Sequence, residues 1–176
     1  LRREEVDLVG LLVDTVADAR AAGPEHDWQL DLAVLEPPAG ATAEEAEDFL
    51  PEPPLVIGDE ARLRQVVVNL LANARVHTPA GSHVTTTLVR EGDTLIVRIH
   101  DDGPGIAPDV RDRLFERFAR GDSSRERRTG STGLGMSIAL AIVQSHGGSI
   151  DVDSSTASED HGTTFTVRLP AAVVEE

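Results

Sequence analysis

Two asparagines four positions apart are the first residues in this sequence that could do chemistry. Asn69 and Asn73 belong to N-L-L-A-N-A in a strongly helical stretch, so they share one helix face, and Gln65 lies one turn earlier. The apolar stripe of this helix points elsewhere, which leaves the amide row facing water or a cavity. A carboxamide oxygen suits Mg²⁺, which also takes substrate phosphates and waters. Taken alone, two such residues favour a solvated helix face.

The second group is D-D-G-P-G-I at Asp101–Ile106, directly after a predicted strand. A carboxylate at the end of the strand, Asp101, can accept a hydrogen bond from an amino group of a ligand. Gly103 and Gly105 let the backbone approach a ligand without a Cβ collision. The alternative is an ordinary Asp-Gly turn.

The third group is the glycine cluster Gly130–Gly135, which precedes a predicted helix at Leu134–His146. Free N–H groups at the start of a helix form a natural anion site. The preceding loop is rich in arginine, with Arg117, Arg120, Arg125, Arg127 and Arg128. A local arginine excess in an acidic chain is suited to attract a polyphosphate. The alternative is a flexible linker.

Composition excludes several function classes. The 176 residues carry a formal charge of −15, which disfavours nucleic acid as a partner. Cysteine is absent, so neither disulfides nor a thiolate metal site can form. All 16 basic residues are arginine, and a P-loop, whose G-K-[ST] ending needs lysine, is therefore excluded. We find no apolar run long enough to cross a bilayer and no signal peptide.

Periodicity and turn residues predict the elements that position these groups. In the first half we expect a short extended entry and helix at Val6–Ala22, strands at Trp28–Leu35 and Leu55–Ile57, and a helix from Asp59 to about Val76. Residues 36–54 read as a surface insertion with a short helical turn at Ala43–Phe49. In the second half we expect a hairpin at Val84–Val89 and Thr94–His100, a short helix at Pro108–Leu114, the helix Leu134–His146, and strands at Ser149–Asp153 and Thr163–Leu169 with a loose connection.

This order predicts one domain over residues 1–176. Its fold class is α/β (α+β), a two-layer sandwich in which a mixed, largely antiparallel sheet carries helices on one face.

Taken together and in this order, the motifs resemble the catalytic, ATP-binding domain of bacterial two-component sensor histidine kinases. That domain belongs to the GHKL ATPase superfamily, shared with gyrase, mismatch-repair ATPases and heat-shock chaperones. The matching segments are Asn69–Ala74 with His77-Thr78 after it, Asp101–Ile106, L-F-x-x-F at Leu114–Phe118, Ser131–Met136, His146–Ile150, Gly162–Phe165 and the opening Val6–Leu12. The resemblance covers nearly the whole chain and implies a Bergerat-type ATP-binding fold.

The resemblance also implies roles for individual residues. Asn73 would be the Mg²⁺ ligand, Asp101 the acceptor from the adenine amino group, and Arg120 a phosphate contact in a lid over ATP at about 118–132. Asn73 and Arg120 would be the catalytic residues. The implied ATP-binding set is Asn69, Asn73, His77, Asp101, Gly103, Gly105, Ile106, Phe118, Arg120, Thr132, Gly133, Leu134 and Gly135.

Three features depart from the family pattern. Val76 stands where Lys or Arg is frequent, so one phosphate contact is missing or is supplied by Arg75 or the lid. Ser131 replaces a glycine of the second glycine box, and the insertion at 36–54 is longer than usual.

The leading hypothesis is a protein-histidine kinase domain with ATP and Mg²⁺ as cofactors. It would transfer the γ-phosphate to a histidine on a separate dimerisation and phosphoacceptor domain, and a response regulator would act downstream. None of the six histidines here has the acceptor setting, so acceptor, sensor and membrane anchor would lie outside this cytoplasmic domain. The alternatives are an anti-sigma-factor-type serine kinase and a nucleotide-gated interaction module without phosphotransfer.

Overall fold

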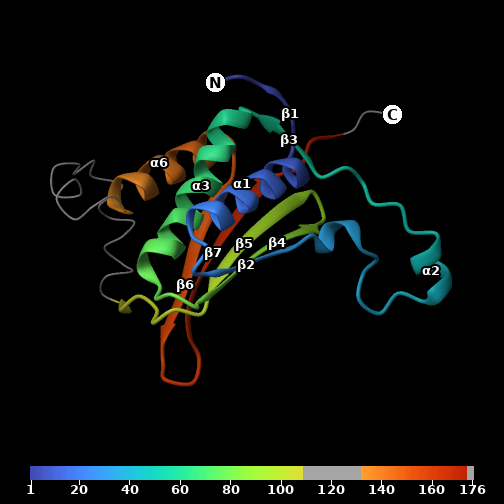
Figure 1. Ribbon diagram of the computed structural model, residues 1–176. Coiled ribbons are helices and arrows are strands. Elements are labelled where there is room, and N and C mark those ends of the chain that lie inside the picture. The colour runs from blue at the N-terminus through green and yellow to red at the C-terminus, as the bar shows by residue number, and fades with distance from the viewer. Residues whose placement is uncertain (109–131, 174–176) are drawn as a thin grey trace.

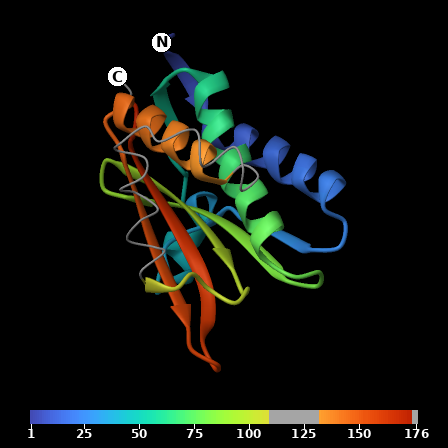
Figure 2. The same ribbon diagram turned by 90° about the vertical axis from the view of Figure 1, so that its left-hand side faces the viewer.

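The structure, a computed structural model, describes residues 1–108 and 132–173, and only the backbone at 132–134. Five strands form one sheet in the order β2 (Asp27–Asp31), β4 (His83–Glu91), β5 (Thr94–Asp101), β7 (His161–Pro170) and β6 (Ser149–Thr156). Pairing is parallel between β2 and β4 and antiparallel between the other neighbours. Helices α1 (Leu8–Ala22), α3 (Glu60–His77) and α6 (Thr132–Ser145) cover one face of this sheet (Figures 1 and 2). The predicted mixed, largely antiparallel two-layer fold is confirmed.

Strict alternation along β5 and β7 builds the face of the sheet that lies under the helices. Leu95, Val97 and Ile99 are buried and pair with buried Leu169, Val167 and Phe165 of β7. The next residue in this alternation is Asp101, which pairs with Thr163. A side chain at this period points to the same face as the core residues before it. The sheet therefore brings a carboxylate to the end of its apolar row, beside the helices.

Helix α3 begins and ends where its sequence requires. The carboxylate of Asp59 caps it by accepting from the Arg62 N–H at 3.3 Å. The helix stops at His77 because Thr78 precedes a proline and adopts extended geometry, with φ −124° and ψ 147°. Its apolar stripe is buried as predicted, with Leu63, Val66, Val67, Leu70, Leu71 and Ala74 facing the core.

A second small sheet, which the sequence did not predict, joins β1 (Glu4–Asp7) to β3 (Leu55–Gly58) in antiparallel register. His146, just after α6, links the end of α6 to the residue that precedes α3. Its Nδ1 donates to the Ile142 carbonyl at 2.7 Å, and its Nε2 accepts from the Asp59 N–H at 3.0 Å. The start of α3 is thereby fixed to the end of α6.

The predicted strand at Trp28–Leu35 is too long. β2 ends at Asp31, and Ala33–Leu35 form a 3₁₀ turn that buries Val34 and packs against β4. Of the three residues of this turn only Val34 is buried, whereas Leu35 is exposed. Prediction and structure agree on the other strands and helices of the described ranges, within a few residues at each end.

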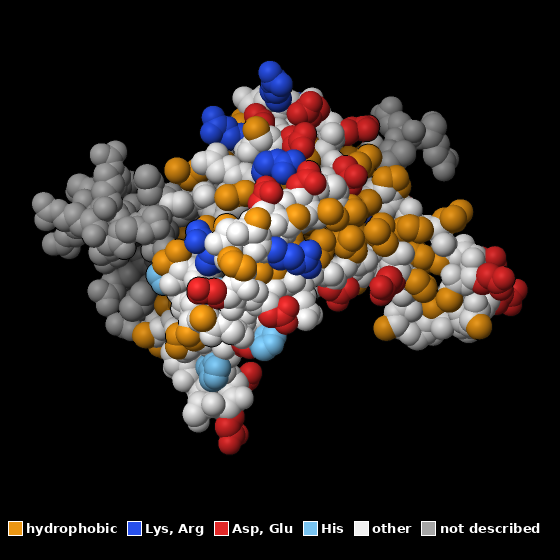
Figure 3. All heavy atoms as spheres, viewed as in Figure 1, with side chains coloured by type: hydrophobic (Ala, Val, Ile, Leu, Met, Phe, Trp, Pro, Cys, Tyr) orange, Lys and Arg blue, Asp and Glu red, His pale blue; other side chains and the backbone are white. Residues whose placement is uncertain are grey.

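Residues 36–54 form an arm that stands away from the sheet and carries α2 (Ala43–Glu47), close to the predicted turn (Figure 1). A capping box between Thr42 and Glu45 closes the start of α2. Arg90 anchors the far end, since it pairs with Glu52 at 3.2 Å and donates to the Pro53 carbonyl. Acidic side chains gather at the tip of the arm (Figure 3). None of the described helices has the length and apolar content needed to span a membrane.

Candidate nucleotide site

The amide row of α3 borders a cavity at the start of α6. Asn69 donates from Nδ2 to the Gly135 carbonyl at 3.2 Å, which joins the two helices. The cavity has a volume of about 140 Å³ and is lined by Asn69, Ala72, Asn73, Arg75, Val76, Gly135 and Met136. The two asparagines and Gln65 are half-buried. The sequence left open whether this row faces water or a cavity, and in the structure Asn69 and Asn73 border a cavity.

Asn73 differs from Asn69 in having no hydrogen bond to its side chain among the described residues. Its amide oxygen is therefore able to bind a ligand. Nowhere in the described ranges do three His, Asp or Glu side chains gather as a metal site would require. A cation here would depend on one neutral oxygen together with phosphate and water oxygens, a coordination that Mg²⁺ accepts. The residues present fit a magnesium-phosphate group.

The second glycine box lies where the prediction needs it. Helix α6 begins at Thr132, so Gly133 and Gly135 lie near its start, and Gly135 lies beside Asn69. N–H groups of a first helical turn have no partner within the helix and can receive an anion. Phe118, Arg120, Ser131 and the rest of the predicted lid, the L-F-x-x-F motif, and the predicted helix from Pro108 all fall largely or wholly outside the described residues.

Asp101 is 6% exposed at the end of β5. Burial raises the pKa of its carboxyl, and a hydrogen bond from the Gly103 N–H to Oδ1 at 3.0 Å opposes that rise. A backbone hydrogen bond from Thr163 also acts against the rise, so protein N–H groups hold the carboxylate at the end of the strand. A buried acceptor of this kind selects strongly for a partner that donates to it.

The two glycines of this loop are required by neighbouring protein atoms as well. A Cβ on Gly103 would collide with the Thr78 methyl group, and a Cβ on Gly105 would collide with the Ser155 carbonyl oxygen. Gly105 also has φ +80°, which side-chain-bearing residues rarely adopt. The sequence prediction considered close approach of a ligand; the structure adds close packing against α3 and the β6–β7 hairpin.

His26 and Thr78 support this loop, and the sequence did not point to His26. Thr78 Oγ1 donates to the Ala74 carbonyl at 2.6 Å, so it must accept from His26 Nε2 at 2.8 Å. The imidazole of His26 lies against Trp28, with ring centroids 5.7 Å apart. This contact holds the Thr78 methyl against Gly103.

His83 holds the other aspartate of the loop. Asp102 Oδ1 accepts from the His83 N–H at 2.7 Å, and Oδ2 lies 2.8 Å from His83 Nδ1. The hydrogen bond to Asp102 raises the pKa of His83, and Asp27 at 3.6 Å adds to this. Partial burial works against ionisation of Asp102, but hydrogen bonds and charge from His83 prevail and lower its pKa.

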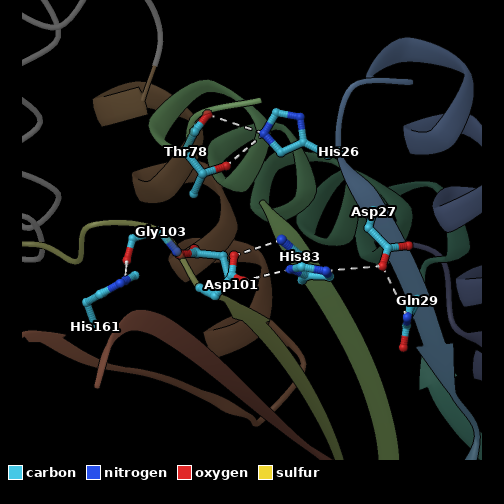
Figure 4. A network of polar contacts seen from close by, with 9 residues as sticks. His26, Asp27, Gln29, Thr78, His83, Asp101, Gly103 and His161 are labelled. Carbon is cyan, nitrogen blue, oxygen red and sulfur yellow. Dashed lines mark hydrogen bonds and ion pairs between the residues drawn. The ribbon is translucent and has the colours of Figure 1, made fainter. Parts of the chain in front are cut away.

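The β6–β7 hairpin closes the remaining side of the loop. Ser154 Oγ accepts from the Ile106 N–H at 2.7 Å, and His161 Nδ1 lies 2.7 Å from the Gly103 carbonyl. These residues lie where the sequence predicted a loose connection, because polar Ser and Asp residues gave no strand signal beyond Asp153. Figure 4 shows His26, His83 and His161 approaching the loop from three sides.

Val76 and Arg75 show what stands at the position where related domains often carry a basic phosphate contact. Val76 is 55% exposed and borders the cavity, so this edge is apolar. Arg75 also borders the cavity, but its Cδ would lie 2.7 Å from a Cβ on Gly23, so its stem packs at the turn between α1 and β2. His77 is exposed at the end of α3 and makes no side-chain hydrogen bond to any described residue.

Comparison with known proteins gives the same answer as these motifs. The family model described as histidine kinase-, DNA gyrase B-, and HSP90-like ATPase matches residues 58–173. The chain is 48% identical over 170 residues to the probable sensor histidine kinase TcrY of Mycobacterium tuberculosis. The aligned residues make up 97% of this chain and 31% of TcrY. The chain therefore spans about a third of that relative's length.

Two solved structures share the fold. The mycobacterial sensor histidine kinase MprB matches with a TM-score of 0.73 and 27% identity, over 98% of this chain and 99% of that one. Full-length ShkA in complex with AMPPNP matches with a TM-score of 0.73 and 26% identity, over 100% of this chain and 32% of that one. The chain belongs to the histidine kinase-, DNA gyrase B- and HSP90-like ATPase family, and within it resembles the catalytic domains of sensor histidine kinases.

Proposed function

We propose that this domain binds Mg-ATP and transfers the γ-phosphate to a histidine on a separate dimerisation and phosphoacceptor domain. One observation carries the proposal: α3 presents the amide of Asn73, to which no described residue hydrogen-bonds, to the cavity, and Thr78, just after the helix, packs against the loop that holds buried Asp101. Asn73 lies in the last turns of α3, and Thr78 is the residue that follows its last residue, His77. One helix thus connects a candidate phosphate side with a candidate base side.

In this proposal Asn73 holds Mg²⁺ and Asp101 accepts from the adenine amino group. Bound Mg²⁺ would neutralise charge on the phosphates. The nucleotide is otherwise bound by Asn69, His77, Gly103, Gly105, Ile106, Thr132, Gly133, Leu134 and Gly135 and, outside the described residues, by Phe118 and Arg120. Arg120 would supply the cation that Val76 does not. The AMPPNP complex of ShkA supports a nucleotide at a site of this fold.

Catalysis would consist of positioning and charge neutralisation. A nitrogen of the acceptor imidazole forms the bond to the γ-phosphorus while the bond to the bridging β–γ oxygen breaks, and ADP leaves. The likeness to TcrY, of which this chain spans 31%, supports an acceptor elsewhere in a longer cytoplasmic kinase, with a response regulator downstream.

The test is incubation with γ-labelled ATP, with and without the acceptor domain, followed by an acid-stability assay of the label. We expect acid-labile phosphohistidine on the acceptor domain, and Asn73→Ala should abolish it. Gln65→Ala is the control and should retain it, because Gln65 lies on the same face of α3, one turn before Asn69. Acid-stable label on this chain alone would indicate a serine kinase. Tight ATP binding without transfer to the acceptor would indicate a nucleotide-gated interaction module.

A further inference from the structure

The β6–β7 hairpin holds the loop Asp101–Ile106 at several points. Ser154 Oγ receives the Ile106 N–H, the Ser155 carbonyl faces Gly105, and Gly162 lies so close to the Asp101 carbonyl that a Cβ there would collide with it. His161 Nδ1 completes the set at 2.7 Å from the Gly103 carbonyl oxygen (Figure 4). The hairpin is therefore part of the wall that shapes the candidate base site.

The direction of the His161 bond follows from chemistry. A carbonyl oxygen can only accept, so Nδ1 must carry the proton. The neutral Nδ1–H tautomer and the imidazolium both carry this proton and can both donate it to the carbonyl.

The peptide unit that His161 binds has no other polar group to hold it. Residue 104 is proline, so the unit between Gly103 and Pro104 has a carbonyl but no N–H. Gly103 also has no side chain that could restrict rotation of its backbone. The hydrogen bond from His161 therefore fixes the orientation of this carbonyl.

That orientation reaches Asp101 through one further bond. The N–H of Gly103 donates to Asp101 Oδ1 at 3.0 Å, while the Thr78 methyl blocks Gly103 from the other side. The carbonyl and the N–H of Gly103 belong to the two peptide units that meet at its Cα, so a loop released from His161 can rearrange at this residue. Such a rearrangement would weaken the bond from the Gly103 N–H to Oδ1, which holds the carboxylate together with a backbone hydrogen bond from Thr163. Asp101 has 6% exposure and could not recover a comparable bond from bulk water.

We propose that His161 is a positioning residue for base recognition: its Nδ1–H holds the Gly103 carbonyl, and thereby helps to keep the Asp101 carboxylate oriented to accept from the amino group of adenine. This inference rests on the proposed function, because it requires an adenine nucleotide at this site. It assigns a role in specificity to an exposed residue that lies just outside the sequence motifs.

The test compares two amides at position 161. His161→Asn places an N–H donor at the distance of Nδ1 from the backbone, whereas His161→Gln places it one atom farther. Calorimetry with Mg-ATP, adenosine and GTP should show about five- to tenfold weaker binding of Mg-ATP and adenosine in His161→Ala and His161→Gln, the loss of about one hydrogen bond. His161→Asn should restore most of it. The ATP preference over GTP should narrow in parallel.

Asp160→Ala, an exposed neighbour in the same turn, is the matched control and should stay within about twofold of the wild type, as expected for a surface change. Amide hydrogen exchange measures the mobility of the loop in the absence of ligand. The Gly103 and Ile106 amides should exchange several-fold faster in His161→Gln than in His161→Asn.

Two failures are distinguishable. A wild type that binds neither ATP nor adenosine would overturn the proposed function and this inference with it. Normal wild-type binding, with affinities for adenosine equal in His161→Ala, His161→Gln and His161→Asn, would overturn the positioning role alone.

Discussion

On the base side of the site, the loop Asp101–Ile106 is bound by α3, β4 and the β6–β7 hairpin, through Thr78, His83, Ser154 and His161. On the phosphate side, one bond from Asn69 to Gly135 joins α3 to α6, and Asn73 is unbonded among the described residues. The two sides also differ in charge chemistry. The base side presents a buried carboxylate, whereas the cavity on the phosphate side is bordered by the amides of Asn69 and Asn73 and by Arg75.

This difference indicates two modes of binding on one scaffold. A base is read by fixed acceptors, and fixing them before binding reduces the entropy lost on association. A metal ligand must instead remain free to bind when ion and phosphates arrive. We therefore expect base recognition to be complete without Mg²⁺, and phosphate recognition to require it.

The largest effect should come from Asn73→Ala, which removes the proposed metal ligand. We expect the Mg²⁺-dependent part of ATP affinity to fall by about a hundredfold or more. Loss of a residue that only hydrogen-bonds a metal ligand already costs up to about a hundredfold in metal affinity, and loss of the ligand itself should cost at least as much. Asn73→Asp keeps an oxygen at the same position and should retain Mg²⁺ dependence. Titration of ATP at several Mg²⁺ concentrations measures this. Full Mg²⁺ dependence in Asn73→Ala would rule out the metal assignment.

Next in size is Gly105→Ala, which tests whether the base side is built in advance. The substitution combines an unfavourable φ of +80° with a collision against the Ser155 carbonyl. We expect a loss of more than about 2 kcal/mol in unfolding free energy. Gly81→Ala is the control, since Gly81 has φ +89° but nothing within 4 Å of its Cβ, and should cost about 1 kcal/mol. Urea unfolding compares them; equal losses would mean that the loop is not tightly packed.

Asp101→Asn should separate function from stability. The amide keeps an acceptor for the Gly103 N–H but presents a donor to adenine, so adenosine affinity should fall by roughly 1–3 kcal/mol. Because burial raises the folded-state pKa of Asp101, its stabilising contribution is present below the unfolded pKa of about 3.9 and is lost as pH rises through the folded value.

Relative to the wild type, apo Asp101→Asn should therefore gain stability as pH rises from about 4 to 7. Denaturant unfolding at several pH values checks this trend. A stability difference that is flat with pH would show that Asp101 is not destabilised by its burial.

The smallest effect should come from the exposed pair of His83 and Asp102. The raised pKa of His83 means stabilisation that is lost as pH rises above about 6.5 and through the folded value. The lowered pKa of Asp102 means stabilisation that is lost as pH falls below about 4. His83→Ala should thus be slightly destabilising near pH 5.5 and neutral near pH 8.5, in thermal unfolding scans. An equal effect at both pH values would indicate packing rather than charge.

The sequence predicted the scaffold well because periodicity reports which residues meet the core. The stripe of α3, the hairpin of β4 and β5, and the position of Asp101 at a strand end all follow from apolar spacing and turn residues. The strand predicted through Leu35 was wrong because the alternating pattern continues into a short 3₁₀ turn, which buries Val34 but leaves Leu35 exposed.

The supports of the base side could not be predicted in the same way. Polar residues from distant parts of the chain support the loop, namely His26, Ser154 and His161. Local sequence patterns cannot predict which polar residues form hydrogen bonds over such distances along the chain. His161 is 58 residues from Gly103. Helix and strand periods did predict that Asn73 lies off the apolar stripe and that Asp101 ends a strand, while their roles toward a nucleotide stay predictions.

The division between a prebuilt base side and a metal-completed phosphate side is tested most directly by calorimetry of ADP with and without Mg²⁺. The proteins are the wild type, Asp101→Ala and Asn73→Ala. We predict that Asp101→Ala weakens ADP by the same factor in both conditions, since separated sites contribute independently. Asn73→Ala should abolish the gain from Mg²⁺ and leave Mg²⁺-free affinity unchanged. A penalty for Asp101→Ala that appears only with Mg²⁺, or an equal loss for Asn73→Ala without it, would contradict the account.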